Sequence, residues 1–86
     1  PPTEDEIVAV ACERERANGP EAFTACQRTQ YRAVAELGSR TPENEMLEPA
    51  VFQGIRDLCV ELWPSDFERR NRCELDKMTA TRLGTE

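Results

Sequence analysis

The sequence has no histidine among its 86 residues, and it contains only one tryptophan and one tyrosine. The missing histidine excludes histidine-based catalytic triads, haem held through histidine and most catalytic zinc sites. Long apolar runs are also missing, since no segment approaches the ~20 residues of a membrane-spanning helix. Basic residues are few, with 11 Lys and Arg against 17 Asp and Glu and a formal net charge of −6. This balance argues against nucleic acid as the main partner, because nucleic-acid-binding proteins place Lys and Arg against phosphates.

The length of the chain predicts one domain with a small core. A chain of this size buries only about 60–65% of the surface that its unfolded form exposes. Disulfide bonds commonly stabilise domains of this kind. We therefore expect a single disulfide-stabilised domain over residues 1–86. Because the chain begins with Pro1-Pro2 and not with methionine, we expect a processed form or an excised domain.

The cysteines form two pairs, with thirteen residues between the members of each pair. Gly19-Pro20 interrupts the first interval and Pro64 the second, and residues of these types end helices. We therefore predict an all-α fold, a small four-helix domain built from two helical hairpins with one cysteine on each arm. The first hairpin covers about residues 4–38, the connector 39–49 and the second hairpin about 50–83. The four cysteines are Cys12, Cys26, Cys59 and Cys73.

The first predicted helix covers about residues 4–17. Thr3 and Glu6 have the spacing of a capping box, in which a hydroxyl and a carboxylate accept hydrogen bonds from backbone N–H groups at the start of a helix. Helical spacing predicts that its buried face comprises Ile7, Val10 and Ala11, with Val8 and Cys12 toward the edge.

The second predicted helix begins at Pro20, after the stop signal Asn18-Gly19, and ends near Leu37. Gly38 is the expected C-terminal signal. Apolar residues at spacings of three and four define one side of this helix, which comprises Phe23, Cys26, Gln30, Tyr31, Val34 and Leu37.

The connector is polar, and Thr41-Pro42-Glu43 is expected to start one short helical turn that places Met46 and Leu47 on the core. The third helix follows over about residues 50–62 and carries one broad apolar face. Gly54 lies inside it and suggests that another helix approaches closely there. The predicted face comprises Val51, Phe52, Ile55, Leu58, Cys59 and Leu62, and Trp63 adds to it.

The fourth predicted helix covers about residues 66–82, and a frayed end follows at 83–86. Ser65 and Glu68 repeat the spacing of a capping box at its start. Three apolar residues share one face, namely Phe67, Leu75 and Met78. Its acidic residues are expected in solvent, where they balance the neighbouring arginines; these are Glu68, Glu74 and Asp76.

Structural disulfides within each hairpin are the favoured use of the cysteines. Cys12 and Cys26 lie at nearly the same height above the first turn, so antiparallel helices bring them within bonding range. The second pair fits this geometry less well, because Cys73 lies away from the main apolar face. Crossed pairing, Cys12 with Cys73 and Cys26 with Cys59, therefore remains an alternative.

Two chemical uses of the cysteines remain as further alternatives. A four-cysteine zinc site is disfavoured because zinc ligands come in close pairs, and none is present here. Thiol redox chemistry would use a closely spaced pair of cysteines or a thiolate activated by nearby positive charge. Only Cys73 has such neighbours, with Arg72 beside it and Arg69 and Arg70 close in sequence.

Trp63, Arg69, Arg70 and Arg72 are the candidate partner-binding residues. Tryptophan and arginine are enriched among the residues that dominate protein interfaces. The alternatives are a tryptophan that closes the core and arginines on a solvated helix face. No carboxylate is arranged with a base or nucleophile for acid–base chemistry, so we expect no enzyme activity, no cofactor and no metal.

The resulting interpretation is a non-catalytic protein-interaction or accessory module of an exported protein. Disulfides predict an oxidising compartment, the periplasm or the cell exterior. We expect a protein partner, and homo-oligomers are compatible with the sequence. Unused apolar residues would form part of the binding face, such as Val8, Val60, Trp63 and Leu83. The alternatives are a thiol-redox or metal-binding protein and a weak nucleic-acid binder that uses the basic fourth helix.

Overall fold

The computed structural model describes residues 1–84, and these residues form helices with no strand among them. The all-α fold of two hairpins is confirmed. The first hairpin contains α1 and a 3₁₀ helix, η1, on one arm and α2 on the other; the short α3 links it to the second hairpin, α4 and α5. The bounds are Glu4–Cys12 for α1, Glu13–Asn18 for η1, Pro20–Ser39 for α2, Pro42–Glu45 for α3, Pro49–Leu62 for α4 and Phe67–Leu83 for α5.

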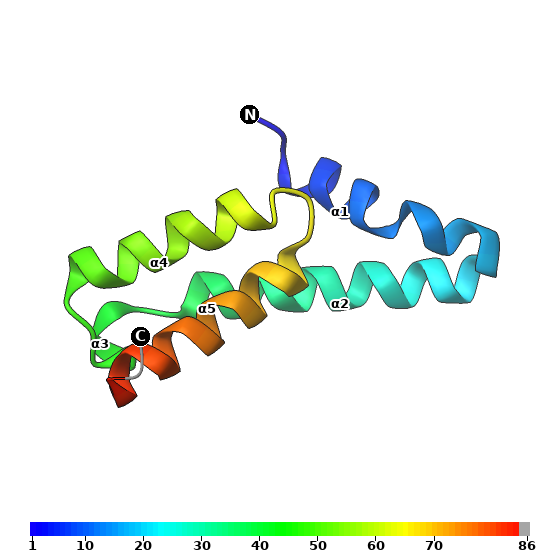
Figure 1. Ribbon diagram of the computed structural model, residues 1–86. Helices are drawn as coiled ribbons and strands as arrows, with labels where there is room; N and C mark the ends of the chain where they lie inside the picture. Colours follow the sequence, from blue (N-terminus) through cyan, green and yellow to red (C-terminus); the bar gives the residue numbers. More distant parts are fainter. Residues whose placement is uncertain (85–86) are drawn as a thin grey trace.

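The long helix α2 organises the molecule (Figure 1). α1 and η1 run back along one half of it, α5 packs along the other half, and α4 packs on α5. α1 and α4 therefore lie toward opposite ends of the molecule. The result is an elongated array with extents of 43 × 25 × 20 Å. This arrangement leaves much of α4 without a second neighbouring helix.

Local signals explain where most helices begin. The Thr3–Glu6 capping box is confirmed, with hydrogen bonds of 3.1 and 3.2 Å between backbone nitrogens and side-chain oxygens. Gly19 turns the chain into α2 with φ of 99°, a conformation that glycine adopts without steric penalty. The predicted Ser65–Glu68 box is wrong. Asp66 caps α5 instead and accepts a hydrogen bond of 3.1 Å from the Arg69 backbone N–H.

The chain between the hairpins departs from the prediction at two places. Gly38 does not end α2, which continues to Ser39 with the cap at Arg40. The short turn after Thr41 is present as α3, but Met46 does not reach the core and is 80% exposed. Met46 ends α3 in the left-handed conformation with φ of 55°, so the chain turns there. Leu47, the next residue, is half-buried.

The apolar core forms where the first hairpin meets the start of α5. Val8 and Cys12 are almost completely buried, whereas Val10 is 62% exposed, so the predicted face of α1 was wrong by part of a turn. The disulfide at Cys12 explains the rotation, because Val8 lies four residues earlier on the same line of the helix. The buried core consists of Ile7, Val8, Cys12, Ala33 and Phe67, with Ala11, Phe23, Cys26, Val34 and Leu37 packed against it.

Tyr31 lies at the edge of this core and is 41% exposed. Its hydroxyl donates a hydrogen bond to the Asp5 carboxylate across the first hairpin. This hydrogen bond raises the pKa of Tyr31 above its ordinary value, and the negative charge of Asp5 acts in the same direction. The tyrosine therefore helps to hold α1 against α2.

Charged side chains fill the junction between the two hairpins. Glu74 of α5 is 1% exposed and forms ion pairs with Arg40 at 2.9 Å and Arg56 at 2.7 Å. Arg40 also donates to Asn71 Oδ1 at 2.7 Å, and Arg56 donates to the Leu37 carbonyl oxygen at 2.7 Å. The hydrogen bond to Glu74 raises the pKa of Arg56 above its ordinary value, and burial opposes it. The prediction that Glu74 lies in solvent is therefore wrong.

The same junction explains the face of α5 that is buried. The buried face consists of four residues spaced by four, three and four along the helix, so they lie on a single line of its surface. Leu75 does not belong to it and is 43% exposed, contrary to the prediction. Two of the four buried residues are polar, which is why apolar periodicity did not find the line. Its members are Phe67, Asn71, Glu74 and Met78.

Candidate functional site

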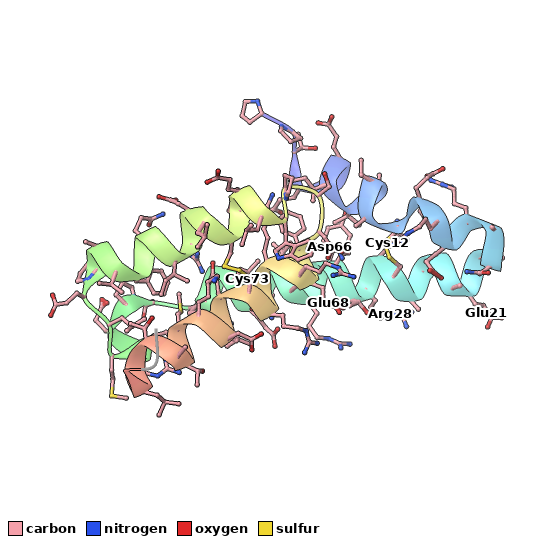
Figure 2. The ribbon with its side chains drawn as sticks, viewed as in Figure 1. Cys12, Glu21, Arg28, Asp66, Glu68 and Cys73 are labelled. Carbon is pink, nitrogen blue, oxygen red and sulfur yellow. A yellow bond between two sulfur atoms is a disulfide. The ribbon has the colours of Figure 1, made fainter. Side chains whose placement is uncertain are left out.

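Both disulfides join the arms of their own hairpin, so the local pairing is confirmed and the crossed pairing is wrong (Figure 2). The Cα atoms are 5.7 Å apart in each bridge, within the usual range for a disulfide. No described cysteine is free. All four cysteines are therefore held in disulfides in this structure, and the thiol-redox alternative stays untested.

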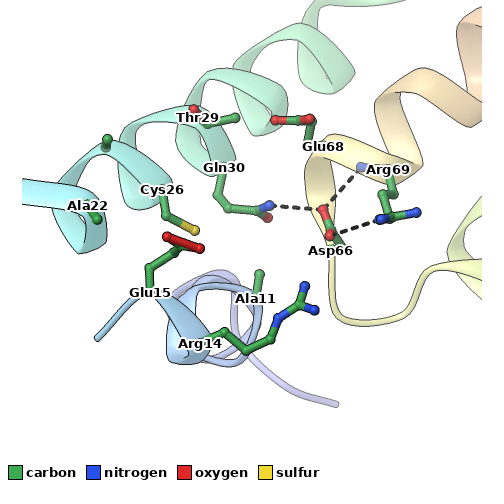
Figure 3. A pocket seen from close by; sticks show the side chains of 11 residues that line it. Ala11, Arg14, Glu15, Ala22, Cys26, Thr29, Gln30, Asp66, Glu68 and Arg69 are labelled. Atoms are coloured by element: carbon green, nitrogen blue, oxygen red, sulfur yellow. Dashed lines mark hydrogen bonds and ion pairs between the residues drawn. The ribbon is translucent and has the colours of Figure 1, made fainter. Parts of the chain in front are cut away.

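A groove of about 500 Å³ separates the first hairpin from the start of α5 (Figure 3). Small residues of α1 and α2 form part of its lining, and Arg14 and Glu15 of η1 lie opposite Asp66 and Glu68. Gln30 crosses it, donating to Asp66 at 2.9 Å and accepting from the Phe67 backbone N–H at 2.8 Å. These polar groups satisfy one another, and the charges around the groove are of both signs. The groove therefore indicates no particular ligand.

The predicted partner-binding residues separate into two groups. Trp63, Arg69 and Arg72 surround a depression of about 150 Å³, which Cys73 and Asp76 complete. The Arg69 guanidinium lies 4.7 Å from the centre of the Trp63 ring, and it also approaches Asp66 at 3.6 Å. A role for these three residues in binding stays a prediction.

Arg70 lies apart from that group and supports the turn between α4 and α5. It donates hydrogen bonds of 2.8 and 2.7 Å to the carbonyl oxygens of Trp63 and Pro64. Burial lowers the pKa of Arg70 below its ordinary value. At the other end of α5, Arg82 pairs with Glu45 at 2.9 Å. Several cations of α5 are thus engaged within the chain, which weakens the case for a nucleic-acid surface there.

Most of the large apolar residues of α4 fall on two parallel lines, which together make up the broad face expected from the sequence. Each line follows spacings of four, three and four, and the two lines are one residue apart, or about 100° around the helix. One line faces the rest of the chain, with Phe52 4% exposed and Cys59 fully buried. Its four members are Phe52, Arg56, Cys59 and Trp63.

The second line, here called the α4 stripe, consists of Val51, Ile55, Leu58 and Leu62. Val51 and Leu58 are each 41% exposed, Leu62 is 51% exposed and Ile55 is half-buried. Periodicity alone cannot separate a covered line from an uncovered one, because both are apolar. The separation required the position of α5.

A third line borders the α4 stripe on the side away from the core. It begins with the small residues Ala50 and Gly54 and continues with the acidic residues Asp57 and Glu61, all of them exposed. A Cβ placed on Gly54 would meet no atom within 4 Å. No described residue therefore makes the close approach that Gly54 would allow.

Other exposed apolar residues are scattered. Val60 is 40% exposed on a different side of α4, and Leu83 is 72% exposed at the end of α5. Val8, expected to belong to a binding face, is 1% exposed and belongs to the core. Trp63 is half-buried. The α4 stripe is thus distinguished by three exposed apolar residues on one line.

Within residues 1–84, no group of three or more Cys, Asp and Glu side chains is placed to hold a metal ion. None of the described helices is long and apolar enough to cross a membrane. No protein-family model, curated protein or solved structure matches the chain.

Proposed function

We propose that this chain is a non-catalytic protein-interaction module of an exported protein, and that the α4 stripe is its binding surface. One observation carries the proposal: Val51, Leu58 and Leu62 remain exposed beside a line of the same helix on which Phe52 and Cys59 are buried. Single exposed apolar residues are normal on protein surfaces. A line of them at spacings of four, three and four is the pattern through which helices recognise one another.

The surroundings of the stripe support the same interpretation. Leu62 is followed directly by Trp63, which with Arg69 and Arg72 borders the small depression at this end of the hairpin. Aromatic and arginine side chains contribute strongly when a partner excludes water from them. We propose that Trp63 extends the binding surface beyond the C-terminal end of α4, and that Arg69 and Arg72 lie at its border.

The disulfides support an oxidising location. Two bridges in a domain this small are typical of proteins that fold outside the reducing cytosol. We propose that the protein acts in the periplasm or at the cell exterior. There the bridges keep both hairpins closed, and α4 is presented to a partner as a preformed helix, which reduces the entropy lost on binding.

Site-specific photo-crosslinking tests the proposed function. A benzophenone amino acid at position 58, in the cells that produce the protein, is expected to yield one main protein adduct. The matched control carries the same group at Val10, which is 62% exposed on α1 and lies off the stripe. Equal adducts from both positions, or none from either, would contradict a binding surface on α4.

A further inference from the structure

We infer that the partner presents a basic amphipathic helix, which crosses α4 at Gly54. This inference rests on the proposed function, because it names the chemistry of the partner at the same surface. Three observations on α4 carry it: the open glycine, the apolar stripe beside it and the sign of the exposed charges.

Gly54 is a poor residue for the middle of a helix, and the fold of this chain does not need it. Its backbone is helical, and an added Cβ would meet nothing within 4 Å, so any small side chain fits. Ala50 lies one turn earlier on the same line, and together the two residues leave α4 narrow beside the stripe. The distance between packed helices depends on the side chains at their contact, so this is where another helix backbone can approach α4 most closely.

The charges beside this narrow part have one sign. Arg56 is the one cation of α4, and this half-buried residue is paired with Glu74. The charges that α4 exposes are Asp57, which accepts a hydrogen bond of 2.9 Å from the neutral Gln53, and Glu61. The whole chain carries a net charge of −6. Complementary charge favours correct encounter and orientation, so the matching helix carries Lys and Arg beside its apolar residues.

A second copy of the chain fits this surface less well. A symmetric contact uses the same patch on both copies. It would bring the Asp57 and Glu61 carboxylates of both copies into one interface, where like charges oppose association. A basic partner helix meets the same stripe without that repulsion.

The test uses synthetic helices as probes, with the complete disulfide-bonded chain as the receptor. One peptide has leucines on a single line with Lys and Arg on both sides, and a second has the same leucines with Glu on both sides. The first is expected to bind with an affinity that falls as salt is added, and the second is expected not to bind. Equal binding of the two peptides would overturn the inference.

Gly54→Leu is the decisive variant, because it blocks close approach and leaves the stripe intact. It is expected to weaken binding of the basic peptide by at least about tenfold, the effect of losing one important interface contact. Thermal melting followed by circular dichroism should show that the variant stays folded. Leu58→Ser and the double variant Asp57→Asn/Glu61→Gln are also expected to weaken binding, whereas Val10→Ser is the control that should not.

Two results would overturn the inference while leaving the proposed function in place. The first is a Gly54→Leu variant that binds the basic peptide as tightly as the original chain, while position 58 still crosslinks to a protein in cells. The second is a dimer in sedimentation that Gly54→Leu dissociates, which would assign the surface to a second copy. Failure of crosslinking at position 58, by contrast, removes the proposed function itself.

Discussion

The first hairpin, α1 with α2, and the second, α4 with α5, are closed by disulfides of equal span, yet their interiors differ. Each bridge joins cysteines fourteen positions apart, with the same Cα–Cα distance of 5.7 Å. Behind the first bridge lie apolar side chains such as Val8 and Ala33. The buried residues of the second hairpin are apolar in part, but they also include the polar Asn71 and Glu74.

The difference shows that the covalent framework and the packing of this domain are set separately. The disulfides hold each hairpin closed, whichever side chains lie between its arms. The hairpins then join through Glu74, whose two arginine partners come from the end of α2 and from α4. A buried ion pair of this kind is not strong evidence of net stabilisation, but it specifies how the two hairpins fit together.

The largest expected effect comes from removing the shared carboxylate. Glu74→Ala leaves Arg40, whose side chain is 7% exposed, and Arg56 without their counter-charge. Loss of one partner from a buried ion pair typically costs about 3–5 kcal/mol. We expect that fall in the free energy of unfolding, measured by urea denaturation. Glu61→Ala, at an exposed carboxylate of α4, is the matched control and should change stability by less than ~0.5 kcal/mol.

A triple variant makes the comparison between the hairpins sharper. Arg40→Met, Arg56→Met and Glu74→Leu together replace the ionic junction with an apolar one like that of the first hairpin. Substitutions of this kind are often neutral or stabilising, by up to about 4 kcal/mol. A Glu74→Ala variant that loses less than about 1 kcal/mol would show that water or rearrangement already satisfies the two arginines.

The next effect concerns the bridges themselves. Cys12→Ala/Cys26→Ala and Cys59→Ala/Cys73→Ala open loops of equal separation, 14 residues in each case. The chain-entropy account predicts a loss of ~3 kcal/mol for either pair. Denaturation of the two double variants measures both losses under the same conditions. If the two losses of unfolding free energy differ by more than about 1 kcal/mol, the packing around each bridge also contributes to its stabilising effect.

The smallest effect distinguishes the two candidate caps of α5, Asp66 and Ser65. Asp66→Ala removes the N-cap of α5 and also the acceptor that Gln30 uses, so we expect a loss of ~1–2 kcal/mol. Ser65→Ala should change stability by less than ~0.5 kcal/mol, because Ser65 makes no cap in the structure. Thermal denaturation of both variants gives the comparison. A larger loss of stability from Ser65→Ala than from Asp66→Ala would identify Ser65, the residue expected from the sequence spacing, as the cap of α5.

Most of the helices and both bridges could be predicted because their signals are local. Each signal acts within a few residues of the chain. Examples are the capping hydroxyl of Thr3, the positive φ of Gly19 and the proline at the first position of α2. Cysteines at matched heights on two antiparallel arms likewise follow from the rise of a helix. Tertiary packing altered the details of these elements and left their order intact.

The candidate binding surface could be predicted only in part. The spacing of apolar residues in α4 identified Val51, Leu58 and Leu62 together with the buried Phe52 and Cys59. It could not tell which would be covered, since hydrophobicity is the same on both lines. The buried Glu74 was missed for the opposite reason, because a charged residue on a polar helix is normally exposed.

The sequence by itself determined most of the helices and favoured their hairpin pairing and the local bridges, because each of these depends on residues that are near one another along the chain. Only the tertiary structure decided the rotation of each helix about its own axis. That rotation buried Val8 and Glu74 and exposed the α4 stripe and Gly54. The rotation is set by contacts between residues far apart in sequence, such as the ion pair of Arg40 with Glu74. The energy of such a contact depends on how the two residues are placed in space, and a local sequence pattern does not specify that placement.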